Sequence, residues 1–221
     1  MIAPIQGPGE LVQLFWRAFP RAFLADVLWL LHESYAKAAY QAYCDHAAPE
    51  AENVLPFLRR ARIEEHLRII AKKFSLKAEA RRGTASWWNH TLIESGNVSF
   101  TQLAAQSPDE IVRWSYERDQ YCADNRQQLL FDKRLKVSRK SLYAILVHGR
   151  EGKDRAKLGF AMIRFPLPKV AGYYESRIDL LKEFPDIAEK FEGKSSMEPA
   201  PPEEILDELS DIDLLRDEDV G

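Results

Sequence analysis

A long apolar pattern over residues 21–46 constrains the fold more than any other feature of the sequence. Its apolar side chains recur three and four residues apart, as on one face of an α-helix, and a second apolar face lies beside the first. The first face comprises Leu24, Leu28, Leu31, Tyr35, Ala38 and Ala42, and the second comprises Phe23, Val27 and Leu30. Because two apolar faces need neighbours on two sides, we expect this helix in a bundle-like core or at a homodimer interface.

Two more helices are expected close to this one. Residues 10–19 are strongly apolar and end at Pro20, which breaks or kinks a helix. Pro49 ends the long helix region, and the next helix is expected over about 54–74, with Pro56 in its first turn.

The later helices are predicted from their boundary residues and their spacing. Ser107 can cap a helix, Pro108 suits its first position and Glu110 completes a capping box, so a helix should run from there to about 131. Its apolar arc includes Cys122, which we interpret as a small core residue. A last helix is expected over about 170–184, with its apolar residues facing inward: Val170, Tyr174, Ile178 and Leu181.

The remaining patterns indicate strands. The stretch "SLKAEARR" is short and extended, 86–104 alternates around the turn "ESGN", and 142–165 contains two clear strands joined by a polar loop. A helix over 86–95 is the alternative for the first half of the 86–104 hairpin. The fold class is α+β: a helical region at 1–75, packed on a mainly antiparallel sheet of hairpins in 76–185 as one compact domain, followed by a flexible acidic tail at 186–221.

Composition indicates a folded protein of the cytoplasm. The chain has 221 residues, of which 46% are hydrophobic, enough for a substantial core. No apolar run approaches the roughly 20 residues of a membrane span, and no basic leader precedes an apolar segment. Cys44 and Cys122 are far apart in sequence, and we expect both to be reduced thiols.

Several chemistries are excluded or disfavoured by spacing. In "HGREGKD" only two residues separate Gly149 from Gly152, and Asp154 follows Lys153, so this stretch does not fit a P-loop and is expected to be a hairpin loop. No G-x-S-x-G elbow occurs, no histidine pairs with another ligand at zinc-like spacing, and no strand carries the acidic-x-Lys pattern of a magnesium nuclease. We therefore predict no metal and no cofactor.

Charge is distributed unevenly along the chain. Residues 186–221 carry 13 acidic and 3 basic side chains, whereas residues 1–185 carry 28 basic and 21 acidic ones. Basic residues concentrate at 59–82 and 133–140, as expected for proteins that contact phosphates, although a solvated helix face and a charged loop would look the same. The predicted nucleic-acid contacts are Arg59, Arg62, Lys72, Lys73, Arg81, Arg82, Lys133, Arg134, Lys136, Arg139 and Lys140.

The stretch "RRGTASWWNHTLIESG" allows two interpretations. In a strand, Trp88, His90 and Leu92 share one face and Asn89 lies on the other. The first interpretation is a strand buried against helices, with its polar groups satisfied internally. The second is a ligand-facing strand in which Trp88, Asn89 and His90 contact a ligand attracted by the preceding arginines.

The acidic tail completes the functional hypotheses. Ile205, Leu209 and Ile212 keep helical spacing, so this segment could dock on a protein partner, or the acidic tail could compete for the basic surface. The alternative is a terminus that only increases solubility. The first hypothesis is a non-catalytic protein that binds DNA or RNA and is regulated by its tail. The second is an interaction subunit of a larger assembly, and the third is an enzyme with a site around Arg82, Asn89 and His90.

Overall fold

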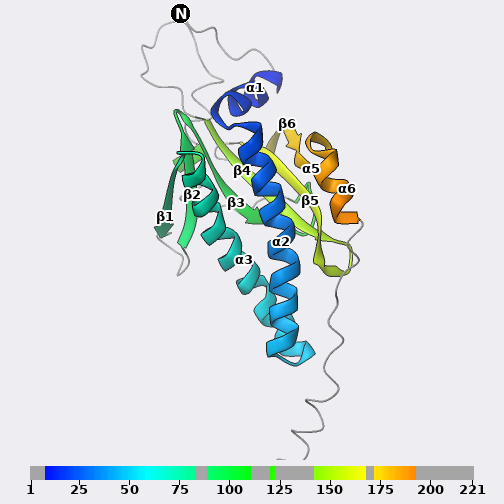
Figure 1. Ribbon diagram of the computed structural model, residues 1–221. Coiled ribbons are helices and arrows are strands. Elements are labelled where there is room, and N and C mark those ends of the chain that lie inside the picture. Colours follow the sequence, from blue (N-terminus) through cyan, green and yellow to red (C-terminus); the bar gives the residue numbers. More distant parts are fainter. Residues whose placement is uncertain (1–7, 83–88, 111–119, 123–141, 168–171, 193–221) are drawn as a thin grey trace, which may run out of the picture.

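The computed structural model describes residues 8–82, 89–110, 120–122, 142–167 and 172–192, and Figure 1 shows the N-terminal helices lying against one face of a single sheet. The sheet has six strands, and four of its five strand pairings are antiparallel. The predicted α+β class, with an N-terminal helical region packed on a mainly antiparallel sheet, is confirmed.

The three N-terminal helices lie close to their predicted positions. They are α1 (Pro8–Ala18), α2 (Arg21–Asp45) and α3 (Ala48–Lys73). The prediction for α3 was wrong at its start, because Pro49 occupies its first turn and Pro56 lies in its interior. Proline suits a first turn, and the exposed Pro56 removes only one backbone donor from the long helix, so the helix continues through it.

Both apolar faces of α2 are covered within the chain. Leu24, Leu28 and Leu31 of the first face and Phe23 and Val27 of the second are fully buried. The two-faced pattern is therefore explained by packing on the sheet and on the neighbouring helices.

The strands follow one another in the sheet in the order of the sequence. They are β1 (Lys77–Arg82), β2 (Asn89–Ser95), β3 (Val98–Ala104), β4 (Leu142–Glu151), β5 (Asp154–Pro166) and β6 (Tyr173–Asp179). Both predicted hairpins are confirmed, and residues 89–95 form a strand, not a helix. Gly96, with a φ of +58°, supplies the left-handed position of the β2–β3 turn.

The two hairpins share one sheet because β3 and β4 pair in parallel, from Val98 with Leu142 to Ala104 with His148. A parallel pair needs a crossover connection, and residues 105–141 supply it. The helix predicted to begin at Ser107 is wrong at that boundary, since residues 106–109 form bends and turns and Glu110 accepts the backbone N–H of Gln106. Within the rest of that prediction, only 120–122 are described, and they are helical.

The last predicted helix was also wrong. Residues 173–179 form β6, which pairs with β5, and helix begins only at α5 (Leu180–Glu183), followed by α6 (Pro185–Glu192). Ser176 and Ile178 are buried while Glu175 and Arg177 are exposed, which is the alternation of a strand. The acidic segment predicted from residue 186 therefore begins inside α6, and residues 193–221 lie outside the described part.

The main core lies between the helices and the sheet. Phe100 of β3 is fully buried, and its ring centroid lies 5.0 Å from that of Phe19, 5.9 Å from Phe15 and 6.1 Å from Phe23. A smaller core occupies the opposite face of the sheet and contains Leu92, Cys122, Tyr143, Ile145, Val147 and Phe160. Cys122 is buried, as predicted, and both cysteines are free thiols. In the described ranges, no helix is long and apolar enough to cross a membrane.

Candidate functional site

The sheet opens between β2 and β3, and Glu64 of α3 fills the opening. The pairing of the two strands stops at Ile93 and Phe100. Beyond that point one carboxyl oxygen of Glu64 accepts the backbone N–H of Thr91 at 2.5 Å, and the other accepts the side-chain amide of Gln102 at 2.7 Å. Arg68, one turn further along α3, donates to the Thr91 hydroxyl at 2.9 Å. Glu64 therefore fixes α3 against both strands.

A chain of buried and partly buried hydrogen bonds continues from Glu64 to α2. Because a carboxylate can only accept, the amide nitrogen of Gln102 faces Glu64 and its oxygen faces His148. His148 Nε2 must then donate to Gln102, at 2.8 Å, and its Nδ1 accepts the hydroxyl of Tyr35, at 2.9 Å. We call these four residues, Tyr35, His148, Gln102 and Glu64, the polar chain; they connect α2, β4, β3 and α3.

Burial keeps both titratable side chains at the α2 end of the polar chain neutral. Burial raises the pKa of Tyr35 to about 12, against the opposing charges of Arg59 and Arg150. Burial, reinforced by the positive charge of Arg59, lowers the pKa of His148 to about 3. A neutral imidazole is the form that can donate at Nε2 and accept at Nδ1, so the hydrogen bonds and the pKa shifts agree.

The buried histidine predicts a specific loss of stability in acid. In the unfolded chain His148 titrates near its ordinary pKa of about 6.5, so between about pH 6.5 and pH 3 the unfolded state binds one more proton than the folded state. The free energy of unfolding should fall with decreasing pH in this window, at a slope that approaches about 1.4 kcal/mol per pH unit. His148→Gln keeps one hydrogen-bond donor and one acceptor but does not titrate. Its free energy of unfolding should therefore lack the part of the acid-induced fall that comes from His148. Denaturant titrations of the unaltered chain and of His148→Gln, between about pH 6.5 and pH 3, measure the free energy of unfolding of each. If the two free energies fell in parallel with decreasing pH, the prediction would be contradicted.

Tyr35 also positions the first member of an arginine group. The guanidinium of Arg59, on α3, lies 3.9 Å from the centroid of the Tyr35 ring and donates to the backbone oxygen of Arg155 at 2.6 Å. Stacking on an aromatic ring suits the planar guanidinium and holds it in one orientation. The polar chain thus holds the ring on which Arg59 rests.

Two more arginines come from the β4–β5 hairpin. Arg150 is exposed at the end of β4, and Arg155 is half-buried at the start of β5 and pairs with Glu52 at 2.9 Å. The strand register shifts on both sides of Arg150, and Gly159 lies against this irregularity, where a Cβ would come 2.6 Å from the Arg150 carbonyl oxygen. Only glycine therefore fits beside the backbone that places Arg150.

Arg59, Arg150 and Arg155 form what we call the arginine cluster. Burial lowers the pKa of the Arg59 guanidinium and the charges of Arg150 and Arg155 lower it further, while Tyr35 opposes the shift. Among the described residues, Glu52 pairs with Arg155 and Glu151 pairs with Lys157 at 2.5 Å, whereas no carboxylate lies within 4.0 Å of Arg59 or Arg150. Like charges held this close favour the binding of an anion.

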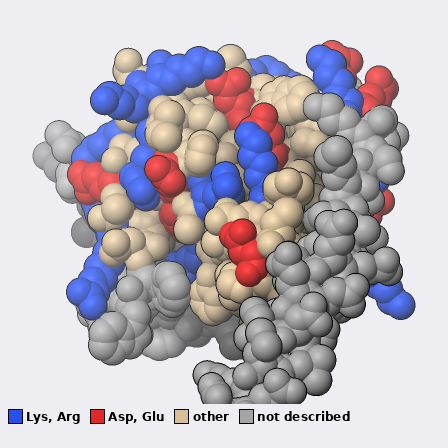
Figure 2. Space-filling model, turned by 60° about the horizontal axis from the view of Figure 1, so that its bottom comes forward, with Lys and Arg blue, Asp and Glu red and all other residues tan. Residues whose placement is uncertain are grey.

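The other predicted basic residues do not join this cluster. Arg62 lies one turn beyond Arg59 and donates to Gln41 at 3.1 Å, whereas Lys72 and Lys73 lie about 20 Å away along α3. Lys73 is paired with Asp26 at 2.6 Å. Figure 2, which brings the lower end of the Figure 1 view forward, shows Lys and Arg interspersed with Asp and Glu. The basic residues on this side form separate groups, not one continuous field.

The basic residues of β1 are partly neutralised on the strand itself. Arg81 pairs with Glu79 at 3.2 Å and approaches Glu94 at 3.9 Å. Arg82 is exposed, and no carboxylate of the described residues is within 4.0 Å of it. The predicted contacts Lys133, Arg134, Lys136, Arg139 and Lys140 lie outside the described residues.

The aromatic stretch is described only from Asn89 onward, so Trp88 lies outside it. Asn89 is exposed opposite Arg82, and His90 is half-buried opposite Arg81, with its ring 6.3 Å from that of Tyr121. The three residues of the enzyme hypothesis, Arg82, Asn89 and His90, thus lie at the same end of the β1–β2 pair. Across the described ranges, no group of three or more His, Cys, Asp or Glu side chains could hold a metal ion.

Sequence reasoning missed Arg150 and Arg155. The stretch that contains them was interpreted only as a hairpin loop, and that interpretation is confirmed. A signal was present, because two arginines that flank a two-residue turn must lie at the same end of a hairpin.

No protein-family model, no curated protein and no solved structure matches the chain.

Proposed function

We propose that the protein binds nucleic acid through its phosphates, without catalysis of its own, and that the arginine cluster is the main contact. The observation that carries the proposal is the convergence of three guanidiniums from α3 and the β4–β5 hairpin, of which only Arg155 is paired with a carboxylate of the described residues. Arg59 is anchored on Tyr35, and Arg150 extends to the surface.

The chemistry of the cluster suits a phosphodiester backbone. Guanidinium groups present several donors in one plane and bind phosphate oxygens through paired hydrogen bonds. Lys153, exposed in the turn between β4 and β5, and Arg62, one turn along α3, extend the positive charge on either side. Contacts of this kind fix the position of a nucleic acid without reading its bases, so we expect weak sequence preference and strong dependence on salt.

Fluorescence anisotropy with labelled single- and double-stranded DNA and RNA tests the proposal. The double variant Arg150→Gln/Arg155→Gln, in the full chain at low salt, should weaken binding by about 10- to 100-fold, because each lost charge-assisted contact contributes roughly 1.4 kcal/mol.

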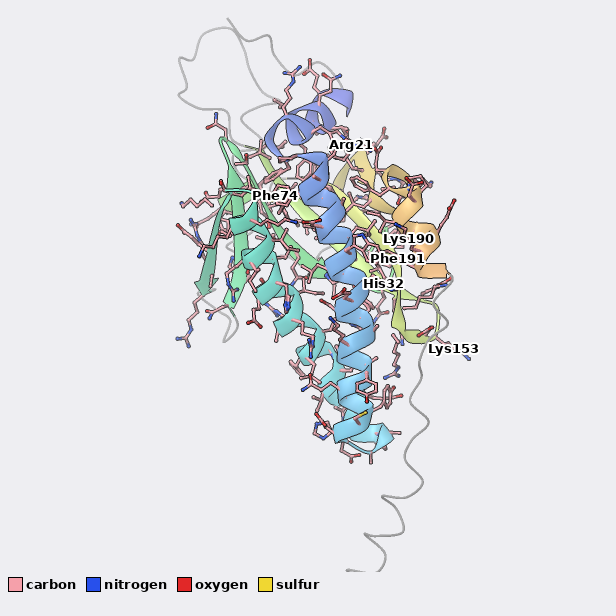
Figure 3. The ribbon with its side chains drawn as sticks, in the orientation of Figure 1. Arg21, His32, Phe74, Lys153, Lys190 and Phe191 are labelled. Carbon is pink, nitrogen blue, oxygen red and sulfur yellow. The ribbon has the colours of Figure 1, made fainter. Side chains whose placement is uncertain are left out.

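The matched control removes two arginines elsewhere. Arg17 and Arg21 lie at the start of the helical layer, and Arg21 is about 21 Å from Tyr35 along α2. Figure 3 shows Arg21 and Lys153 well separated. Arg17→Gln/Arg21→Gln should weaken binding less than about threefold. An equal loss in both double variants, or no binding by the unaltered chain to any of the four ligands, would overturn the proposal.

A further inference from the structure

Helix α6, the last helix of the described residues, packs on α2 near the residue that holds Arg59. Phe191 of α6 is 4% exposed, and its ring stacks on that of His32 with centroids 3.8 Å apart and planes at 6°. Trp29 meets Phe191 edge-on at 5.1 Å, and Lys190 lies 6.0 Å from the Trp29 ring. Figure 3 shows Phe191 and Lys190 beside His32. The end of α6, the last described element, therefore lies against this part of α2.

The α2 residue that contacts α6 lies close to the α2 residue that holds one member of the arginine cluster. His32 precedes Tyr35 by three residues, a rise of about 4.5 Å along α2, and Tyr35 carries the Arg59 guanidinium on its ring. The end of α6 thus lies about one turn of α2 from the tyrosine ring that holds Arg59.

The sequence beyond α6 has the opposite charge to the cluster. Residues 193–221 contain ten acidic and two basic side chains, and six of the ten acidic residues lie within 203–213. The ten residues 193–202 span up to about 33 Å when extended, which is ample for 203–213 to reach the cluster. Because the segment is tethered, its effective concentration at the cluster is in the millimolar range, well above that of a free ligand.

We infer that the acidic segment 203–213 binds the arginine cluster within the same chain and competes there with nucleic acid. This inference rests on the proposed function for the identity of the competing ligand, but the contact between segment and cluster does not depend on it. The carboxylates supply the negative charge that the cluster lacks, and the α6 anchor keeps them close. Binding of nucleic acid must then displace the segment, which lowers the affinity of the full chain.

Zero-length carbodiimide crosslinking, which joins a lysine amine to a carboxylate, tests the contact directly. Lys153, exposed in the β4–β5 turn between Arg150 and Arg155, is the reporter. We expect crosslinks from Lys153 to residues 203–213 in the full chain, and their loss in Arg150→Gln/Arg155→Gln. Mixing isotope-labelled with unlabelled chains shows whether the crosslinks lie within one chain. Absence of these crosslinks, or crosslinks only between chains, would overturn the inference.

Nucleic-acid affinity tests the competition. Four carboxylates of the segment are neutralised in the full chain: Glu203→Gln, Glu204→Gln, Asp207→Asn and Glu208→Gln. Binding should tighten about tenfold, a coupling typical of two ligands that exclude each other, and the gain should vanish when Arg150 and Arg155 are also replaced.

The matched control neutralises four exposed carboxylates of the folded body. These substitutions are Glu65→Gln, Glu175→Gln, Asp186→Asn and Glu189→Gln. The control has the same net charge and should gain less than about threefold. An equal gain in both variants would overturn competition at the cluster, as would no gain in either.

The two proposals fail in different ways. Crosslinks from Lys153 without nucleic-acid binding by any variant would retain the segment contact and contradict the proposed function. Nucleic-acid binding that depends on Arg150 and Arg155 but is unaffected by the segment would retain the proposed function and contradict the competition. Ile205, Leu209 and Ile212 would then remain as a docking segment for a protein partner.

Discussion

Glu64→Ala should lower the free energy of unfolding by about 3–5 kcal/mol. Glu64 is 7% exposed, and both of its carboxyl oxygens accept hydrogen bonds, from the Thr91 backbone and the Gln102 amide. Alanine would leave these two donors without partners in the opening between β2 and β3, and Gln102 would no longer be oriented toward His148. Since α3 meets the sheet at this point, the loss should be global and should appear in chemical denaturation.

Glu65→Ala is the matched control for this effect. Glu65 is the next residue on α3 and is exposed, so its loss should change the free energy of unfolding by less than about 0.5 kcal/mol. Glu64→Gln, which keeps one acceptor but places an amide nitrogen against a donor, should fall between the two. If Glu64→Ala and Glu65→Ala were equally stable, the polar chain would not hold the helices to the sheet.

Phe100→Ala should lower the free energy of unfolding by about 3–5 kcal/mol as well, through the cavity it leaves. Phe100 is fully buried on β3, among the rings of Phe15 and Phe19 from the first helical segment and Phe23 from α2. Three aromatic neighbours cannot collapse readily into the space of a lost ring, so the cost should lie toward the upper part of this range.

Phe57→Ala is the same substitution at an exposed position. The Phe57 side chain on α3 is 52% exposed, so we expect a loss of less than about 1 kcal/mol. Thermal or denaturant unfolding of both variants makes the comparison. A small loss for Phe100→Ala would mean that the helical layer is not packed on β3 as described.

The parts of the fold that could be predicted are those set by local pattern. The spacing of Leu24, Leu28 and Leu31 defines α2 whatever it packs against, and the turn around Gly96 defines the β2–β3 hairpin. The parallel pairing of β3 with β4 could not be predicted, because no local signal specifies which strands of separate hairpins meet. It depends on the crossover formed by residues 105–141.

The mistaken helix at 170–184 shows how two periodicities can coexist. Val170, Tyr174, Ile178 and Leu181 have helical spacing, but Ser176 and Ile178 also alternate with the exposed Glu175 and Arg177. The neighbouring element decided between them, since β5 offers a free edge along which residues 173–179 can pair. Tertiary context overrides local pattern in such short segments.

The candidate site was predictable only in part. The basic composition of 59–82 included Arg59 and Arg62, but it also included Lys73 and Arg81, which are paired with carboxylates. Which arginines converge depends on Tyr35 and His148, which are 113 residues apart in sequence and touch only in the folded chain. A polar chain of this kind has no sequence signature.

The most direct test of the central claim, that the arginine cluster contacts phosphates, is the salt dependence of nucleic-acid binding. A plot of the logarithm of the association constant against the logarithm of the salt concentration has a slope of about −0.9 for each phosphate contact on duplex DNA. The chain with the four neutralised segment carboxylates is used beside the unaltered one, to separate competition by the segment. The slope for Arg150→Gln/Arg155→Gln should be shallower by about 2, and that for Arg17→Gln/Arg21→Gln unchanged. An unchanged slope for Arg150→Gln/Arg155→Gln would contradict phosphate contact at the cluster.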